Sequence, residues 1–235
     1  MDTVLFIAEI ILLVAAVILV TVGTEKLICR KNHRELARIT TKKITMVGVF
    51  AAVSGVLMVL EVPLPFSLPF YKLDISEVPV LILSFAYGPV AGILCELLKI
   101  LVKLVLKGTG SAFVGELANF IIGCIFVVPA GIIYIFRKSR KQAVLACVCG
   151  TLLMTAAGSV LNAVYLLPKF AVLYGMPLED IIAMGTRVNS AVNSINTLVL
   201  FCVVPVNLLK GIVDSVLTML LYKRLSREIK GEAQR

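Results

Sequence analysis

The segment 205–215, PVNLLKGIVDS, carries three polar side chains within one of the most apolar parts of the chain. Asn207, Lys210 and Asp214 are three and four residues apart, so they share one face of a helix. A charge at membrane depth costs about 3 kcal/mol unless it is paired or hydrated, and ionisable residues there commonly mark functional sites. The spacing of Lys210 and Asp214 also fits a buried ion pair, in which Asp214 keeps the lysine charged.

Other apolar segments contain polar residues at the same helical spacing. These are Glu96, Lys99 and Lys103; Glu116 and Asn119; and Asn162 and Tyr165. If these faces turn inward together, they form a polar interior in the outer half of a helical bundle. Amides and a lysine offer hydrogen-bond donors and acceptors with little net charge, which suits a neutral heteroaromatic ring with carbonyl and N–H edges. A structural role is the alternative: Glu96, Lys99 and Glu116 would neutralise one another, and Asn162 would link two helices.

The composition indicates an integral membrane protein with an all-α fold. Of 235 residues, 60% are hydrophobic, against about 45–50% in soluble domains, and the mean hydropathy is +1.02. The apolar runs are continuous rather than alternating, which favours helices over a β-barrel. The predicted helices are 4–22, 44–62, 77–87, 90–106, 114–136, 143–167 and 191–222.

These helices predict a six-helix membrane bundle with one extra N-terminal transmembrane helix. The expected division is 1–43 for the extra helix and a basic linker, 44–225 for the bundle and 226–235 for a basic tail. Residues 77–87 span only ~16 Å, short of a ~30 Å membrane core, so neighbouring helices must shelter them. The proline-rich, apolar segment 63–76 is expected to fold back over the protein as a loop, and 168–190 to form an outer loop.

The net charge of +9 is placed as in a multi-pass membrane protein rather than a nucleic-acid-binding protein. Sixteen of the 23 lysines and arginines fall in three blocks that flank apolar runs, at 26–43, 137–141 and 223–235. The positive-inside rule puts such blocks in the cytoplasm. The sequence therefore predicts a plasma-membrane protein with a cytoplasmic C-terminus, and no nucleic-acid partner.

The sequence offers little for catalysis. The single histidine, His33, lies in the basic linker, and no HExxH, G-x-S-x-G or Walker A motif occurs. We therefore expect no enzyme activity, no catalytic residue, no metal site and no cofactor. Active transport would need an ATPase on another subunit, or an ion gradient.

Small residues on the helix predicted at 44–62 suggest a helix–helix contact. Gly48 and Ala52, and Ala51 and Gly55, form two small-xxx-small pairs, which allow another helix to approach closely. The contact can lie within the bundle or with a partner protein.

The run FYKLDISEVPVLILSFAYGPVAGILCELLKILVKL, followed by GTGSAFVGELANFIIG, resembles the riboflavin-type substrate-binding (S) components of energy-coupling factor vitamin transporters. The resemblance covers about residues 40–225 and includes KLDIS, GELANF and PVNLLKG. It implies a six-helix bundle that binds riboflavin near the outer face as a transported ligand. It also implies a transmembrane coupling subunit and two ABC-type ATPases as partners in the lipid bilayer.

The resemblance also implies roles for individual residues. Asn162 falls on the family's ring-binding asparagine, and Asn207 and Lys210 on its polar residue and lysine three apart. The loop with Tyr71, Lys72 and Leu73 matches the loop that closes over the ligand. The GELANF motif adds Glu116 and Asn119 to the predicted binding residues. Gly48 and Ala52, with Ala51 and Gly55 beside them, fall near the family's Ala-x-x-x-Ala coupling motif.

Three other functions remain open from the sequence. One is an S component for a different vitamin or a nucleobase, because one fold serves many ligands. Another is an ion-coupled carrier that uses the face with Glu96, Lys99, Lys103 and Glu116 as a relay. The third is a membrane scaffold that binds no ligand.

Overall fold

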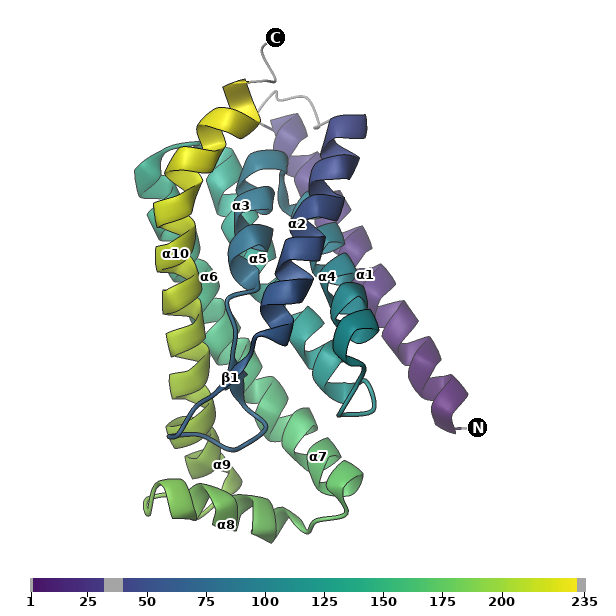
Figure 1. The fold of residues 1–235 in the computed structure, drawn as a ribbon, viewed down its shortest axis with the longest axis vertical. Coiled ribbons are helices and arrows are strands. Elements are labelled where there is room, and N and C mark those ends of the chain that lie inside the picture. The colour runs from purple at the N-terminus through teal and green to yellow at the C-terminus, as the bar shows by residue number, and fades with distance from the viewer. Residues whose placement is uncertain (1, 32–39, 232–235) are drawn as a thin grey trace.

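The computed structural model describes residues 2–31 and 40–231, and these form an elongated bundle of helices with one short hairpin (Figure 1). The membrane-embedded bundle is built from α2 (Thr41–Val59), α3 (Glu77–Tyr87), α4 (Pro89–Lys107), α5 (Val114–Phe136), α6 (Arg140–Leu161) and α10 (Val204–Gly231). The remaining elements are α1 (Asp2–Lys31), β1 (Val62–Pro63), β2 (Lys72–Leu73), η1 (Asn162–Leu166), α7 (Leu167–Tyr174), α8 (Leu178–Val188), α9 (Ile195–Leu198) and η2 (Val199–Val203).

Four helical stretches among the described residues are long and apolar enough to cross a membrane: Thr41–Val59, Val114–Phe136, Arg140–Tyr174 and Ile195–Tyr222. The prediction of an all-α membrane protein is therefore confirmed. The short α3 is sheltered as expected, because every residue from Glu77 to Phe85 is buried. It ends at Gly88, whose φ of 96° suits glycine, and Pro89 opens α4 directly afterwards.

A wide turn interrupts each of the two helical stretches Arg140–Tyr174 and Ile195–Tyr222, close to a proline. In a helix, Pro168 and Pro205 cannot donate a backbone hydrogen bond to the carbonyl four residues earlier. The wide turns η1 and η2 directly precede these prolines. Turns of this kind are frequent at functional sites, and here the two touch each other.

Several expected boundaries are wrong. The predicted outer loop 168–190 is mostly helical, since α7 extends to Tyr174 and α8 follows. The first helix continues to Lys31 instead of ending at residue 22, so it takes in part of the predicted linker. α10 also continues to Gly231, beyond the predicted helix end at residue 222. His33 lies outside the described residues.

The N-terminal helix α1 packs against α4 and α5 on one side of the bundle (Figure 1). Val14, Val17 and Ile18 contact a cluster around Ile93 and Phe120. The buried Glu25 carboxylate accepts a hydrogen bond from the backbone N–H of Val90, at 3.1 Å, and so satisfies a donor in the first turn of α4.

The hairpin segment, residues 62–73, lies across the end of the bundle that also holds α7, α8 and α9 (Figure 1). β1 and β2 pair antiparallel, with Val62 opposite Leu73. Leu68 at the tip is fully buried in a cluster with residues of α7, α8 and α9. The expectation that this proline-rich segment folds back over the protein is confirmed.

Candidate ligand-binding site

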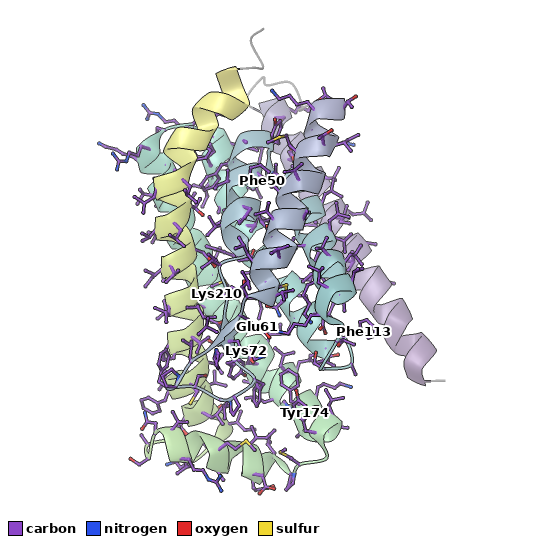
Figure 2. All side chains as sticks on the ribbon, in the orientation of Figure 1. Phe50, Glu61, Lys72, Phe113, Tyr174 and Lys210 are labelled. Carbon is purple, nitrogen blue, oxygen red and sulfur yellow. The ribbon has the colours of Figure 1, made fainter. Side chains whose placement is uncertain are left out.

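A cavity of about 130 Å³ lies beneath the hairpin segment, between α5, α6, η1 and α10. Six predicted binding residues line it: Tyr71, Lys72, Asn119, Asn162, Asn207 and Lys210. Figure 2 shows Lys210 and Lys72 on the same part of the bundle, near Glu61. The structure thus gathers these six predicted residues from positions up to 139 apart in sequence, Tyr71 to Lys210.

Two predicted binding residues do not line this cavity. Glu116 instead forms an ion pair with Lys103 and accepts hydrogen bonds from the hydroxyls of Thr109 and Ser111, at 3.0 and 2.9 Å. It therefore organises the loop between α4 and α5. Leu73 neighbours Lys72 in β2, and successive side chains of a strand point to opposite faces. Because Lys72 lines the cavity, Leu73 points away from it.

Lys210 is paired with Asp74 rather than with Asp214, which corrects the prediction from helical spacing. Its Nζ lies 2.8 Å from Asp74 Oδ2, and the two side chains are only 11% and 6% exposed. Burial alone would raise the pKa of the Asp74 carboxyl, but the charges of Lys210 and Lys99 bring that pKa below its ordinary value. Neither carboxylate oxygen of Asp214 has a hydrogen-bond partner among the described residues.

Asn162 is buried at the first position of η1 and connects this turn to the hairpin segment. Its Nδ2 donates to the Gly158 carbonyl at 2.7 Å, and its Oδ1 accepts a hydrogen bond from the Tyr71 hydroxyl. Tyr71 and Asn162 both line the cavity, so their hydrogen bond closes it. Ligand pockets usually measure about 300–1,000 Å³, so a drug-sized ligand would need this contact to open.

Asn207 approaches the same region from α10. Its Nδ2 is buried and has no hydrogen-bond partner in the described part of the chain. A Cβ atom added to Gly158 would lie 2.9 Å from this nitrogen, so the glycine permits the close approach of α6 and the Asn207 amide. An unsatisfied buried donor costs about 1–3 kcal/mol, which a ligand carbonyl would recover.

Aromatic rings form one wall of the cavity, and the sequence analysis missed them. Phe70 and Phe170 both line it, with ring centroids 5.2 Å apart. Tyr174 extends this cluster, at 5.8 Å from Phe170. The rings belong to the hairpin segment and to α7, the segment predicted to be loop beyond residue 167. Such a wall suits a planar ring, because aromatic faces stack on one another.

A charge network lies beneath the cavity. Lys99 is fully buried, with its Nζ 2.7 Å from Glu77 and 2.5 Å from Glu96. The predicted mutual neutralisation is therefore correct for Glu96 and Lys99, but Glu116 belongs to a separate pair and Glu77 takes its place. Glu77 also lines the cavity, as does Asp74. Both acids stand in the quoted run that begins FYKLDISEVPV, and their position directly before an apolar stretch was a signal that the sequence offered.

The two small-residue pairs of α2 face opposite ways. Gly48 and Ala52 are exposed, and a Cβ on Gly48 would meet no atom within 4 Å. Ala51 and Gly55 are buried; a Cβ on Gly55 would lie 2.4 Å from the side chain of Val102 on α4. The second pair thus serves packing inside the bundle. Its predicted place at a partner interface is inconsistent with this burial.

The family model for the ECF transporter substrate-specific component matches residues 42–222. The chain belongs to this family. As an S component it is a multi-pass membrane protein and part of a transporter rather than an enzyme.

Curated relatives and a solved structure resemble this S component over most of its length. It is 33% identical over 199 residues to the riboflavin transporter RibU of Staphylococcus aureus, covering 85% of this chain and 98% of that protein. It is 32% identical over 193 residues to the riboflavin transporter FmnP of Bacillus subtilis, covering 81% and 95%. A solved S component of a bacterial ECF transporter superposes with a TM-score of 0.64 at 34% identity, covering 80% of this chain and 98% of that one.

Proposed function

We propose that this S component captures riboflavin at the outer face of the membrane and delivers it inward as part of an ATP-driven ECF transporter. The cavity beneath the hairpin segment carries the proposal. It combines an aromatic wall, two buried amides and a lysine, which together match a planar ring edged with carbonyl and N–H groups. The names of the relatives favour the same ligand.

In the proposed complex, riboflavin displaces Tyr71 from Asn162. The ring stacks against Phe70 and Phe170, and its polar edge meets Asn162, Asn207 and Lys210. The half-buried carboxamide of Asn119 and the exposed ammonium of Lys72 also line the cavity, where the ribityl chain would leave the ring. This arrangement assigns a partner to the unsatisfied Asn207 nitrogen.

The ligand assignment is tested on the protein purified alone in mild detergent. A nanomolar binder retains its ligand through purification, so the preparation should show flavin absorbance and release riboflavin on denaturation. A colourless protein that also fails to quench added riboflavin fluorescence would refute the assignment. A screen of other vitamins and nucleobases by thermal shift would then identify the ligand class.

We further propose that residues 44–225 form the ligand-binding domain and that the C-terminus lies in the cytoplasm. In this proposal, Gly48 and Ala52 contact a transmembrane coupling subunit that carries two ABC-type ATPases. Gly48 and Ala52 are exposed, and a Cβ added to Gly48 would meet no atom within 4 Å, which supports this docking face. A bulky Ala52→Leu should leave riboflavin binding intact and stop uptake in cells. Ala156→Leu, at an exposed alanine of α6, is the matched control and should leave both unchanged. Parallel loss of binding in the Ala52 variant would make that face structural.

A further inference from the structure

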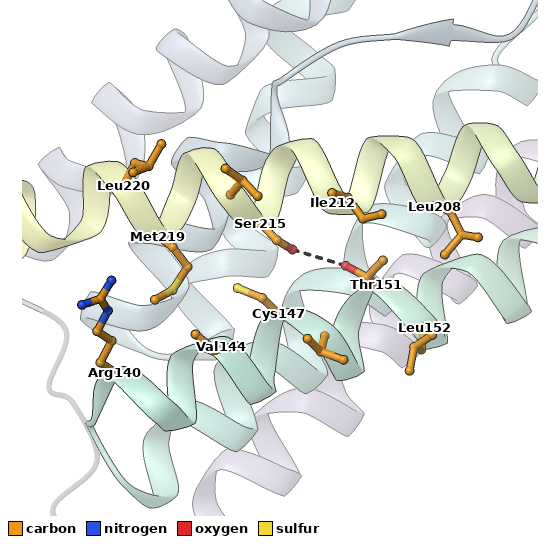
Figure 3. Close-up of a pocket in the computed structure, with 12 residues that line it drawn as sticks. Arg140, Val144, Cys147, Thr151, Leu152, Leu208, Ile212, Ser215, Met219 and Leu220 are labelled. Carbon is orange, nitrogen blue, oxygen red and sulfur yellow. Dashed lines mark hydrogen bonds between the residues drawn. The ribbon is translucent and has the colours of Figure 1, made fainter.

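The cavity beneath the hairpin segment is strongly charged compared with a second cavity of the bundle. That second cavity is a groove of about 500 Å³ between α6 and α10, and Arg140 is the one charged residue among the described residues that line it (Figure 3). The cavity beneath the hairpin segment is lined by two lysines and three acids among its described residues: Lys72, Lys210, Glu61, Asp74 and Glu77. With all five ionised, this lining carries a net negative charge, which disfavours an anionic ligand.

These charges lie at two depths. The side chains of Asp74 and Glu77 are buried. Those of Glu61 and Lys72 reach toward solvent and are 21% and 36% exposed. Glu61 stands between α2 and β1, and Lys72 belongs to β2, so both lie where the hairpin segment meets the bundle (Figure 2). The outer pair therefore marks the mouth of the cavity.

A second lysine joins Glu61 at this mouth. Lys107, the last residue of α4, has its Nζ 2.7 Å from Glu61 Oε1, and the Nζ of Lys72 lies 2.6 Å from the same oxygen. One carboxylate oxygen thus holds two lysines that would otherwise repel each other. Burial alone would raise the pKa of Glu61, but its two lysine partners bring that pKa below the ordinary value. The carboxylate is therefore ionised at neutral pH.

The chemistry of this carboxylate distinguishes a hydroxyl group from a phosphate. An ionised carboxylate only accepts hydrogen bonds, and a hydroxyl can donate one to it. A phosphate monoester carries a charge of about −1.5 to −2 at pH 7 and offers acceptor oxygens. It would compete with Glu61 for the two lysines and would be repelled by the carboxylate that already holds them.

We propose that Glu61 is a specificity-determining residue, which makes the mouth of the cavity favour riboflavin over its 5′-phosphate ester. This inference rests on the proposed function, since it requires riboflavin in the cavity with its ribityl chain directed toward Glu61. The carboxylate accepts a hydrogen bond from the terminal hydroxyl of the ribityl chain. The same carboxylate keeps Lys72 and Lys107 paired, so that neither lysine is free to attract a phosphate.

The test uses the full chain purified in mild detergent and titrated separately with riboflavin and with riboflavin 5′-phosphate, at fixed pH and ionic strength. Quenching of flavin fluorescence gives both dissociation constants. The wild type should bind riboflavin more tightly. Glu61→Gln should shift the ratio of the two constants about tenfold toward the phosphate ester, the repulsion expected between a dianion and one carboxylate ~6 Å away in a water-like dielectric. Glu179→Gln, at an exposed glutamate of α8 that does not line the cavity, is the matched control and should leave the ratio unchanged.

Two further variants separate the charge of Glu61 from its shape and its effect on folding. Glu61→Asp keeps the carboxylate and should retain the preference for riboflavin. Lys107→Gln leaves Glu61 with one lysine partner and should shift the ratio about tenfold the other way, against the phosphate ester. Circular dichroism and the melting temperature verify folding. If Glu61→Gln fails to fold, the shift in Lys107→Gln decides.

The outcomes separate this inference from the proposed function. Equal affinity of the wild type for the two flavins, or an unchanged ratio in Glu61→Gln, would overturn the role of Glu61 and leave riboflavin as the ligand. A shift in Glu61→Asp as large as that in Glu61→Gln would also overturn it, because the charge would then be irrelevant. A wild type that binds neither flavin would overturn the proposed function and this inference together.

Discussion

Replacement of Lys210 by methionine tests the proposed site most directly. Methionine keeps most of the length of the side chain and removes its charge. A hydrogen bond from a charged donor contributes about 1.5–3 kcal/mol, so loss of the bond to a riboflavin carbonyl should weaken binding by roughly 10–100-fold. The assay is a titration that follows quenching of riboflavin fluorescence by the purified protein.

The structure adds a second effect that must be separated from the first. Lys210 also neutralises Asp74, at 2.8 Å and largely out of solvent. Breaking a buried ion pair from one side costs up to about 3–5 kcal/mol. Asp74 retains a hydrogen bond from the backbone N–H of Ser76, at 2.9 Å, so the loss of stability should fall below that range. The double variant Lys210→Met, Asp74→Asn should recover the melting temperature but not the affinity.

Two outcomes would refute this reasoning. A loss of affinity below twofold in Lys210→Met would remove the lysine from the site. Full recovery of affinity in the double variant would mean that Lys210 acts only by holding the loop through Asp74. Lys141→Met, at an exposed lysine near the start of α6, controls for the loss of a positive charge and should bind normally.

Three further predictions concern the cavity and its cover. Tyr71→Phe removes the hydrogen bond between Tyr71 and Asn162 at the cavity. Stopped-flow fluorescence should then show riboflavin associating about fivefold faster, the equivalent of one neutral hydrogen bond. An unchanged rate would mean that this contact does not limit access. Gly158→Ala forces the Asn207 amide aside and should weaken binding about three- to tenfold in the same titration, while unchanged affinity would place Asn207 outside the ligand contact. Burial alone would raise the pKa of Glu61, but the ion pairs with its two lysine partners bring the pKa below 4.5. The pairs therefore stabilise the fold above pH ~4.5. That stabilisation is lost as the pH falls through the lower pKa of the folded state. Glu61→Gln should therefore lower the melting temperature more at pH 7 than at pH 3, and an equal decrease at both would refute the linkage.

Much of the fold followed from the sequence because lipid imposes simple rules on a chain. Long apolar runs must be helical in a membrane, and Gly88–Pro89 marks a sharp break between two helices. The helix 114–136 was predicted with its observed bounds. The region after residue 167 was not, because proline and polar residues suggested a loop, whereas Pro168 in fact stands at the start of α7, where its missing N–H is tolerated.

The site was only partly predictable for a related reason. Helical spacing correctly placed Asn207 and Lys210 on one face, but it names only partners on the same helix. It therefore assigned Lys210 to Asp214, four residues away, when the lysine pairs with Asp74, 136 residues away. The same limit applied to α2, where spacing could not tell the buried pair with Gly55 from the exposed pair with Gly48.

The sequence alone determined that the chain is a helical membrane protein and which polar residues are too costly at membrane depth to be incidental. Composition and periodicity are local properties, and burial in lipid penalises each residue according to its own chemistry. Only the tertiary structure decided which charges pair, which small residues face outward and how the hairpin segment closes the cavity through Tyr71. Those outcomes depend on how α3, α6 and α10 pack together, and packing brings into contact groups that no spacing along the chain connects.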